Sequence, residues 1–209
     1  MAGQTLPSLL IGSDPASQGT ALTSVGKTSG AYSLEGNVAS MSLNDAKLSA
    51  GASFGLWQPG YAKDKVIGVG AAYRLGDRLA FGLQFKSLIQ PSYDVVSESG
   101  SVKDSFTPGE TNFAVGAAYS VTDWLSVGVT GRMVMSTLAD DAKANVFGAD
   151  VAVFYRKDAL SAGLSVNNVG GKVNYGGEDY DQPMLARAGV AYRIGNPESS
   201  SVTPSVEAD

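Results

Sequence analysis

Four stretches of this chain alternate between large apolar residues and small or polar residues, at residues 65–75, 78–89, 111–121 and 124–135. Successive side chains of a β-strand point to opposite faces, so each stretch predicts a strand with one bulky face. In the second stretch the bulky face has Leu79, Phe81, Leu83 and Phe85, and the other face has Ala80, Gly82, Gln84 and Lys86. Such strands, apolar toward lipid and small or polar toward a lumen, are typical of transmembrane β-barrels. We therefore expect an all-β, antiparallel, outer-membrane β-barrel.

The composition argues against several other classes of protein. The 209 residues include no Cys and no His, which removes thiolate chemistry, the commonest general base and the commonest metal ligand. The net charge is −5 and the basic residues are scattered, so we expect no nucleic-acid partner. The carboxylate pair Asp140-Asp141 falls in an expected loop, and the acidic run 176–181 offers three carboxylates where Ca²⁺ needs about six oxygens. We expect no catalytic residue, no metal site and no cofactor, and hence no enzyme.

The chain divides at about residue 45. Residues 1–45 lack sustained alternation, and Asp14 before Pro15 is a candidate N-cap of a short helix. The small residues on one face of the strands leave space that this segment would fill. We therefore expect residues 1–45 to form a hatch inside the barrel and residues 46–209 to form about eight strands of an incomplete barrel. The expected strands are 46–56, 65–75, 78–89, 111–121, 124–138, 145–156, 159–169 and 184–194.

The expected connections alternate in length. Tight hairpins join the strands at 75–78, 121–124 and 156–159, whereas 58–64, 90–110, 139–144 and 170–183 are mostly longer. Outer-membrane barrels place short turns at the periplasmic end and long loops outside the cell. Six aromatic residues near strand ends fit either an interfacial girdle or ordinary cross-strand packing: Trp57, Tyr73, Tyr119, Trp124, Tyr155 and Tyr192.

Five charged residues fall on the small-residue face by alternation: Arg74, Lys86, Arg132, Asp150 and Arg187. A charge facing lipid at the midplane costs about 2–4 kcal/mol, so the lumen is the expected side. These side chains either fasten the hatch or line a route for a ligand, and we prefer the first interpretation. We also expect Asp14 or Glu35 of the hatch to pair with one of the cations.

Several motifs resemble the PorV/PorQ proteins, which belong to the wider FadL-like outer-membrane transporters. The resemblance rests on residues 14–19 (DPASQG), 35–41 (EGNVASM) and 167–170 (NNVG), followed by Tyr175, Gln182-Pro183, Arg187, Gly189 and Tyr192. Asn37 and Ala39 match an Asn-Pro-Ala element of that family, while Val38 replaces its Pro and Gln182 replaces a Leu. The resemblance covers essentially the whole chain and implies a barrel of about fourteen strands with an N-terminal hatch.

The resemblance also implies a function. PorV-type members work in type IX protein secretion or surface export, and the alternative is FadL-like transport of hydrophobic small molecules such as fatty acids. Implied partners are outer-membrane lipid, secretion-system subunits or cargo signal domains, or a hydrophobic small molecule. The implied location is the outer membrane of a Gram-negative bacterium. Candidate residues contacting a ligand or the hatch are Asp14, Asn37, Arg74, Lys86, Arg132, Asp150 and Arg187.

The two ends of the sequence suggest a piece of a longer protein. The first ten residues (MAGQTLPSLL) lack the features of a signal peptide, and the last nine (SVTPSVEAD) look like the start of a strand. We expect an N-terminal fragment truncated at its C-terminus, and the alternative is an eight-stranded barrel with a polar tail. A secretion partner should bind at the long loops, including 90–110. A transporter should instead show an apolar pocket that reaches the hatch.

Overall fold

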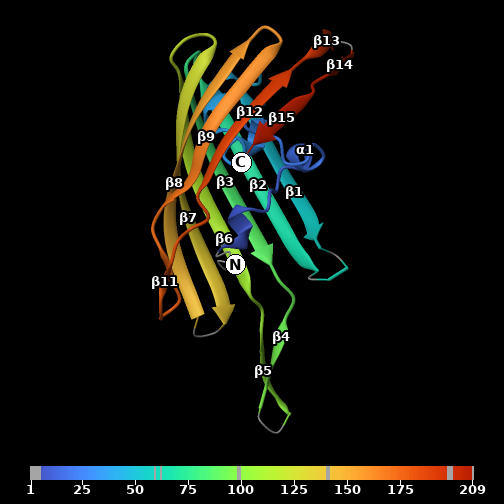
Figure 1. Cartoon of the computed structure of the whole chain (residues 1–209), viewed down its shortest axis with the longest axis vertical. Coiled ribbons are helices and arrows are strands. Elements are labelled where there is room, and N and C mark those ends of the chain that lie inside the picture. Colours follow the sequence, from blue (N-terminus) through green and yellow to red (C-terminus); the bar gives the residue numbers. More distant parts are fainter. Residues whose placement is uncertain are drawn as a thin grey trace.

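The computed structural model describes residues 6–58, 60–61, 63–97, 100–139, 142–196 and 200–208. The described residues form one large curved sheet, three small two-stranded sheets and an N-terminal segment of short helices (Figure 1). None of the described helices is long and apolar enough to cross a membrane. The pair Asp140-Asp141 lies outside the described residues.

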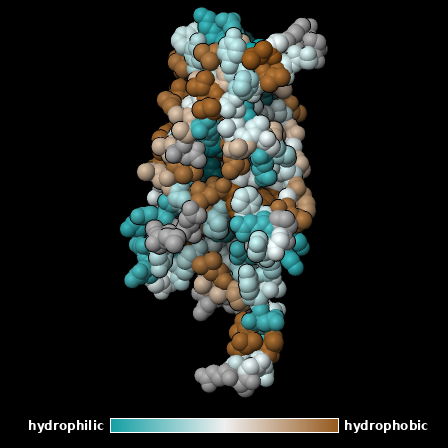
Figure 2. All heavy atoms as spheres, turned by 45° about the vertical axis from the view of Figure 1, so that its right-hand side comes forward, coloured by the Kyte–Doolittle hydropathy of each residue, from teal (hydrophilic) through white to brown (hydrophobic). Residues whose placement is uncertain are grey.

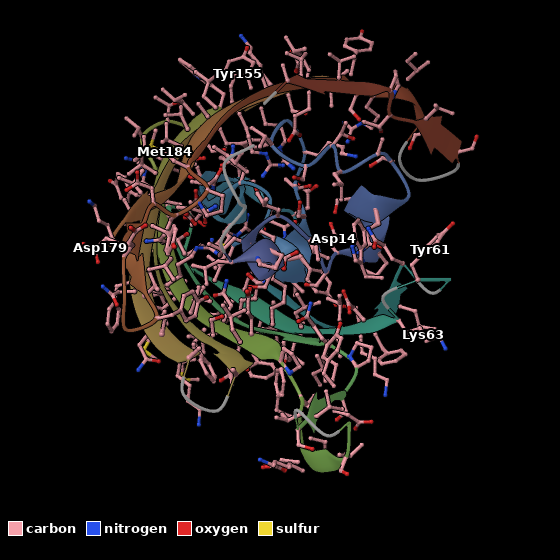
Figure 3. All side chains as sticks on the ribbon, turned by 60° about the horizontal axis from the view of Figure 1, so that its bottom comes forward. Asp14, Tyr61, Lys63, Tyr155, Asp179 and Met184 are labelled. Carbon is pink, nitrogen blue, oxygen red and sulfur yellow. The ribbon has the colours of Figure 1, made fainter. Side chains whose placement is uncertain are left out.

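The large sheet has nine antiparallel strands over the described residues, in the order β1-β2-β3-β6-β7-β8-β9-β12-β15. It curls into an open arc, with β1 and β15 at its edges (Figure 3). This architecture is typical of the wall of an outer-membrane β-barrel and confirms the predicted fold class. The strands are β1 Leu48–Trp57, β2 Asp64–Leu75, β3 Leu79–Ile89, β6 Gly109–Ser120, β7 Leu125–Ala139, β8 Ala142–Lys157, β9 Leu160–Gly170, β12 Leu185–Tyr192 and β15 Ser205–Ala208.

The eight predicted strands are all present, with ends within about three residues of their predicted positions, which is the usual uncertainty of boundaries. The small sheets were not predicted, because strands of two to five residues are too short for alternation to be recognised. Two of them lie within predicted connections, and the third begins where the last predicted strand was expected to end. These strands are β4 Tyr93–Val96 with β5 Val102–Phe106, β10 Val173–Asn174 with β11 Asp179–Tyr180, and β13 Ile194–Asn196 with β14 Ser200–Val202.

The connections at the two ends of the wall differ in length, as the sequence predicted. The tight turns β2–β3, β6–β7 and β8–β9 lie at one end, the upper end in Figure 1, and the long β3–β6 and β9–β12 connections lie at the other. We call these the short-turn end and the long-loop end. Two connections depart from this pattern. The connection from β12 to β15 carries the β13–β14 hairpin at the short-turn end, and at the long-loop end β8 begins at Ala142, directly after β7 ends at Ala139, where a loop over 139–144 was expected.

Residues 6–45, called the N-terminal segment below, lie against the concave face of the sheet (Figure 3). The segment contains η1 Pro7–Leu9, α1 Pro15–Gln18, η2 Gly30–Tyr32 and η3 Val38–Leu43. Asp14 accepts a hydrogen bond from the Ala16 N–H and Pro15 follows it, which confirms the predicted N-cap. Asn37 caps η3 in the same way by accepting from the Ala39 N–H.

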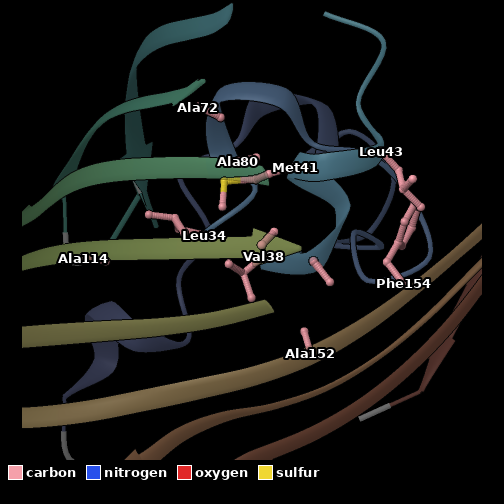
Figure 4. Close-up of a cluster of buried hydrophobic side chains, with 11 residues drawn as sticks. Leu34, Val38, Met41, Leu43, Ala72, Ala80, Ala114, Ala152 and Phe154 are labelled. Atoms are coloured by element: carbon pink, nitrogen blue, oxygen red, sulfur yellow. The ribbon is translucent and has the colours of Figure 1, made fainter. Parts of the chain in front are cut away.

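An apolar core joins η3 to the wall near the short-turn end (Figure 4). Large side chains come mainly from the N-terminal segment, such as Leu34, Val38 and Met41, whereas the wall contributes mostly alanines. The wall alanines are Ala72, Ala80, Ala114, Ala118 and Ala152. The small inner residues therefore make room for the bulk of the segment, and burial of this apolar surface stabilises the contact.

The convex face of the wall carries the bulky apolar residues, and they are exposed. Leu83, Phe147 and Leu164 are each at least 60 % exposed. In the view of Figure 2, apolar patches on the wall alternate with paler and hydrophilic ones. A face this apolar fits lipid better than water.

Four aromatic residues near the short-turn end, Tyr73, Tyr119, Trp124 and Tyr192, are also exposed, as an interfacial girdle requires. Trp57 departs from the girdle interpretation: it packs inward on the apolar cluster of Ile11, Val66 and Leu88. β1 ends one residue later than predicted. Its alternation therefore places the Trp57 side chain on the concave face of the sheet.

Wall glycines mark the points where the backbone of the N-terminal segment comes closest. A Cβ at Gly163 would overlap the Val25 carbonyl oxygen, and a Cβ at Gly70 would overlap that of Ala31. A Cβ at Gly128 would lie 2.8 Å from the Ala39 nitrogen. Glycine is needed here for close approach of two backbones, not for an unusual φ angle.

We expect Gly163→Ala to lower the free energy of unfolding by about 1–3 kcal/mol, because the new methyl group must displace the segment at Val25. The matched control is Gly131→Ala, since a Cβ at this β7 position meets nothing within 4 Å. Urea titration followed by the gel mobility of the folded protein measures both variants. Equal stabilities of the two would contradict the close contact.

Candidate functional site

A belt of buried charges lies between the N-terminal segment and the wall. These charges line a cavity of about 300 Å³. Asp14 and Glu35 of the segment lie on one side of it, and the wall residues include Lys86, Arg132, Arg187 and Glu207. The strands β3, β7, β12 and β15 carry the wall charges, and each of these points to the concave side because alternation places it there.

Lys86 binds the N-terminal segment at two points. Its Nζ lies 3.1 Å from Glu35 Oε1 and donates a hydrogen bond to the Ile11 carbonyl oxygen at 2.9 Å. Glu35 also accepts from the Ser13 N–H and the Ser13 hydroxyl, both at 2.7 Å. Burial alone would raise the pKa of Glu35, but the Lys86 charge and the Ser13 hydrogen bonds outweigh it and lower that pKa. The carboxyl group therefore stays ionised in its pair.

Arg132 and Asp150 form a second buried pair, from neighbouring strands β7 and β8. Arg132 also donates to the Leu34 carbonyl oxygen at 3.2 Å. Asp150 accepts a hydrogen bond from the Asn168 N–H at 2.8 Å, which engages its second oxygen. Arg132 thus links the wall to the segment, and Asp150 holds β9 through the Asn168 N–H.

Arg187 and Glu207 form the third pair, between β12 and β15. Arg187 donates to the Ser24 hydroxyl at 2.7 Å and to the Glu35 carbonyl oxygen at 3.2 Å. Glu207 accepts from the N–H groups of Ser24 and Val25 at 2.6 and 2.8 Å. Charge-assisted hydrogen bonds of this kind are stronger than neutral ones.

The remaining predicted residues lie apart from these pairs. Asn37 donates to the carbonyl oxygens of Val25 and Val153, both at 3.0 Å, and so bridges the segment and β8. Arg74 donates to the Asn44 carbonyl oxygen at 2.7 Å near the short-turn end. Asp14 forms no ion pair within the part of the chain that the structure describes, and its side chain caps α1 instead.

All four wall cations among the predicted residues share one kind of contact: each donates to a backbone carbonyl of the N-terminal segment. The acceptors for Lys86, Arg132, Arg187 and Arg74 are the carbonyls of Ile11, Leu34, Glu35 and Asn44. These hydrogen bonds satisfy carbonyl groups that have no sheet or helix partner of their own.

Two carboxylates of the site were missed at the sequence level. Glu110 accepts from the Ser8 N–H at 2.9 Å, and Glu207 belongs to the third pair described above. Glu110 lies at the edge of a predicted loop. Glu207 lies in the last nine residues, which were expected to begin a strand but were too few to show which face Glu207 would occupy. Continuing the period-two pattern of β6 by one residue would have placed Glu110 on the concave face.

The arrangement suits holding a segment in place. Six of the buried charges form three ion pairs, and no group of acidic residues in the described ranges is placed to hold a metal ion. Two apolar pockets, of about 880 and 410 Å³, lie over exposed convex-face residues such as Val153 and Leu164. The cavity against the N-terminal segment thus contains several charged side chains, while these two apolar pockets lie on the outside.

A family model described as "Type IX secretion system protein PorV" matches residues 2–209. The match covers nearly the whole chain, including the N-terminal segment and every wall strand. No curated protein matched the chain significantly.

We expect Glu35→Gln to lower the free energy of unfolding by about 3–5 kcal/mol, because it leaves the buried Lys86 ammonium group without its partner. Adding Lys86→Met should recover part of that loss, since no buried charge then remains unpaired. The control is Asp45→Asn, which breaks an ion pair with Arg156 whose side chains are 81 % and 31 % exposed and should cost less than about 1 kcal/mol. Similar losses for the Glu35 and Asp45 variants in denaturant titrations would contradict a buried pair.

Proposed function

Because the chain belongs to the PorV family of type IX secretion system proteins, we propose that it serves this pathway as a non-enzymatic barrel in the outer membrane of a Gram-negative bacterium. The family match over residues 2–209 carries the proposal. The apolar convex face of the wall supports contact with outer-membrane lipid. The buried charges support a holding role, since they pair with one another and with the N-terminal segment.

We propose that residues 1–45 act as a hatch and that residues 46–209 supply the barrel wall. The apolar core around η3, the close glycine contacts and the hydrogen bonds from the wall cations support this division. In this proposal Asn37, Arg74, Lys86, Arg132 and Arg187 hold the hatch directly, Asp150 orients Arg132, and Asp14 shapes the hatch by capping α1.

Secretion-system subunits or cargo signal domains are the proposed partners, and the long-loop end is their proposed binding side. Transport of fatty acids or similar molecules has less support. A carrier of apolar molecules needs a continuous apolar path to the hatch, whereas the cavity there has charged side chains such as Glu35, Lys86 and Arg187 among its apolar ones. The apolar pockets sit on the convex face, where lipid is expected.

Deletion of the gene in its native bacterium should stop release of type IX cargo and leave that cargo inside the cell. Immunoblots of cell and medium fractions measure this, and expression of the whole gene from a plasmid should restore release. Uptake of a labelled long-chain fatty acid, measured in the same strains, should not change. Normal cargo release after deletion would overturn the secretion role, and lost fatty-acid uptake would support transport.

Weakening the hatch contacts should make the outer membrane leak. We expect Lys86→Met with Arg187→Gln to admit a large hydrophilic antibiotic, because both cations lose their hydrogen bonds to the segment. A disulfide between Thr23→Cys and Ser205→Cys, whose hydroxyl oxygens lie 2.9 Å apart, should reverse the leak until a reductant is added. The chain has no other cysteine to interfere. A leak that persists with the disulfide formed would argue against a hatch.

A further inference from the structure

The β4–β5 hairpin extends from the long-loop end well beyond the other connections (Figure 1). Side-chain hydrogen bonds join residues within the hairpin or at its base, for example Ser92 with Thr107 and Ser97 with Ser101. It forms a two-stranded sheet of its own, separate from the wall. An isolated two-stranded hairpin is marginally stable in water, so a third strand would stabilise it.

The hairpin exposes apolar side chains away from the lipid-facing wall, and Figure 2 shows an apolar patch on the hairpin above its tip. Tyr93, Val96 and Val102 are 51 %, 61 % and 60 % exposed. The Tyr93 ring contacts that of Phe106 with centroids 6.0 Å apart, so one aromatic pair also stiffens the base. Apolar side chains gathered in this way on a solvent-facing element indicate a binding surface.

The two edges of the hairpin differ. The register shifts between Val95 and Val96, so that Lys103 is an extra residue on β5. A bulge and a lysine are the devices that protect a strand edge from further pairing. β4 carries neither, because its residues are Tyr93, Asp94 and two valines. The edge of β4 is therefore the one open to another strand.

The charge of the hairpin suggests the character of that strand. Asp94 and Asp104 form no ion pair with any described residue, and Asp94 lies opposite the uncharged Ser105. Cross-strand partners of opposite charge stabilise a sheet, and like charges destabilise it. A strand beside β4 is favoured if it carries a Lys or Arg next to Asp94 and apolar residues next to Tyr93 and Val95.

We propose that the edge of β4 binds an extended segment of a partner protein as a third strand, with alternating apolar residues and one basic residue. Main-chain hydrogen bonds would give the affinity, and the alternate side chains would give the selectivity. The identity of the partner as a protein of type IX secretion rests on the proposed function above. The strand-addition site itself rests on the open edge, the exposed apolar residues and the unpaired Asp94.

The test uses a photo-crosslinking amino acid at position 96 of the chain in its native bacterium, with position 102 as the matched control. Val96 and Val102 face each other across the hairpin and are almost equally exposed, but only Val96 lies on the open edge. We expect a protein adduct several times stronger at position 96, mapped by mass spectrometry to one extended segment with a basic residue. Asp94→Lys should abolish the adduct, and Lys103→Glu should not.

Equal crosslinking at positions 96 and 102, adducts with lipopolysaccharide alone, or no adduct in cells that still release cargo would each overturn the strand-addition site. Cargo release measured in the same strains separates this result from the proposed function. If deletion of the whole gene leaves release unchanged, the secretion role fails. If release requires the gene but Asp94→Lys releases cargo normally, only the hairpin inference fails.

Discussion

The approach of one backbone to another across the concave face is the constraint on which the rest of this structure depends. Gly70, Gly128 and Gly163 let the N-terminal segment touch the wall directly, and the wall alanines leave space for Leu34, Val38 and Met41. Larger inner residues would fill the same space and exclude the segment. The charges of the cavity reach the segment only because this contact holds it at hydrogen-bonding distance.

The interior is layered along the wall. Near the short-turn end the contact is apolar and closely packed around η3. Farther along the wall it becomes polar, with three ion pairs beside a cavity of about 300 Å³. Toward the long-loop end it is apolar again, in the clusters that contain Leu6 and Ile11. Apolar packing is non-directional, whereas buried ion pairs require particular geometry. The apolar contacts fix how closely the segment approaches the wall, and the ion pairs fix its position along the wall.

Much of the wall could be predicted from the sequence, because alternation is strong over ten or more residues in β2, β3, β6 and β7. The inward placement of Lys86 and Arg132 followed from the same pattern. Glu35 was one of the two acidic partners expected for these cations, and it pairs with Lys86. Which cation it would meet could not be predicted, since pairing between the segment and the wall depends on tertiary packing. Glu207 shows the limit most clearly, because a four-residue strand brings it to Arg187.

The cations of the wall hold the N-terminal segment by carbonyl oxygens, which every amino acid possesses. Ile11, Leu34 and Asn44 contribute nothing to these hydrogen bonds that a different residue would lack. The strength of these hydrogen bonds therefore does not depend on which residue supplies the carbonyl group. Exchanges among apolar residues that keep the packing of Ile11 and Leu34 can adjust the fit of the segment, while the four anchoring side chains stay unchanged.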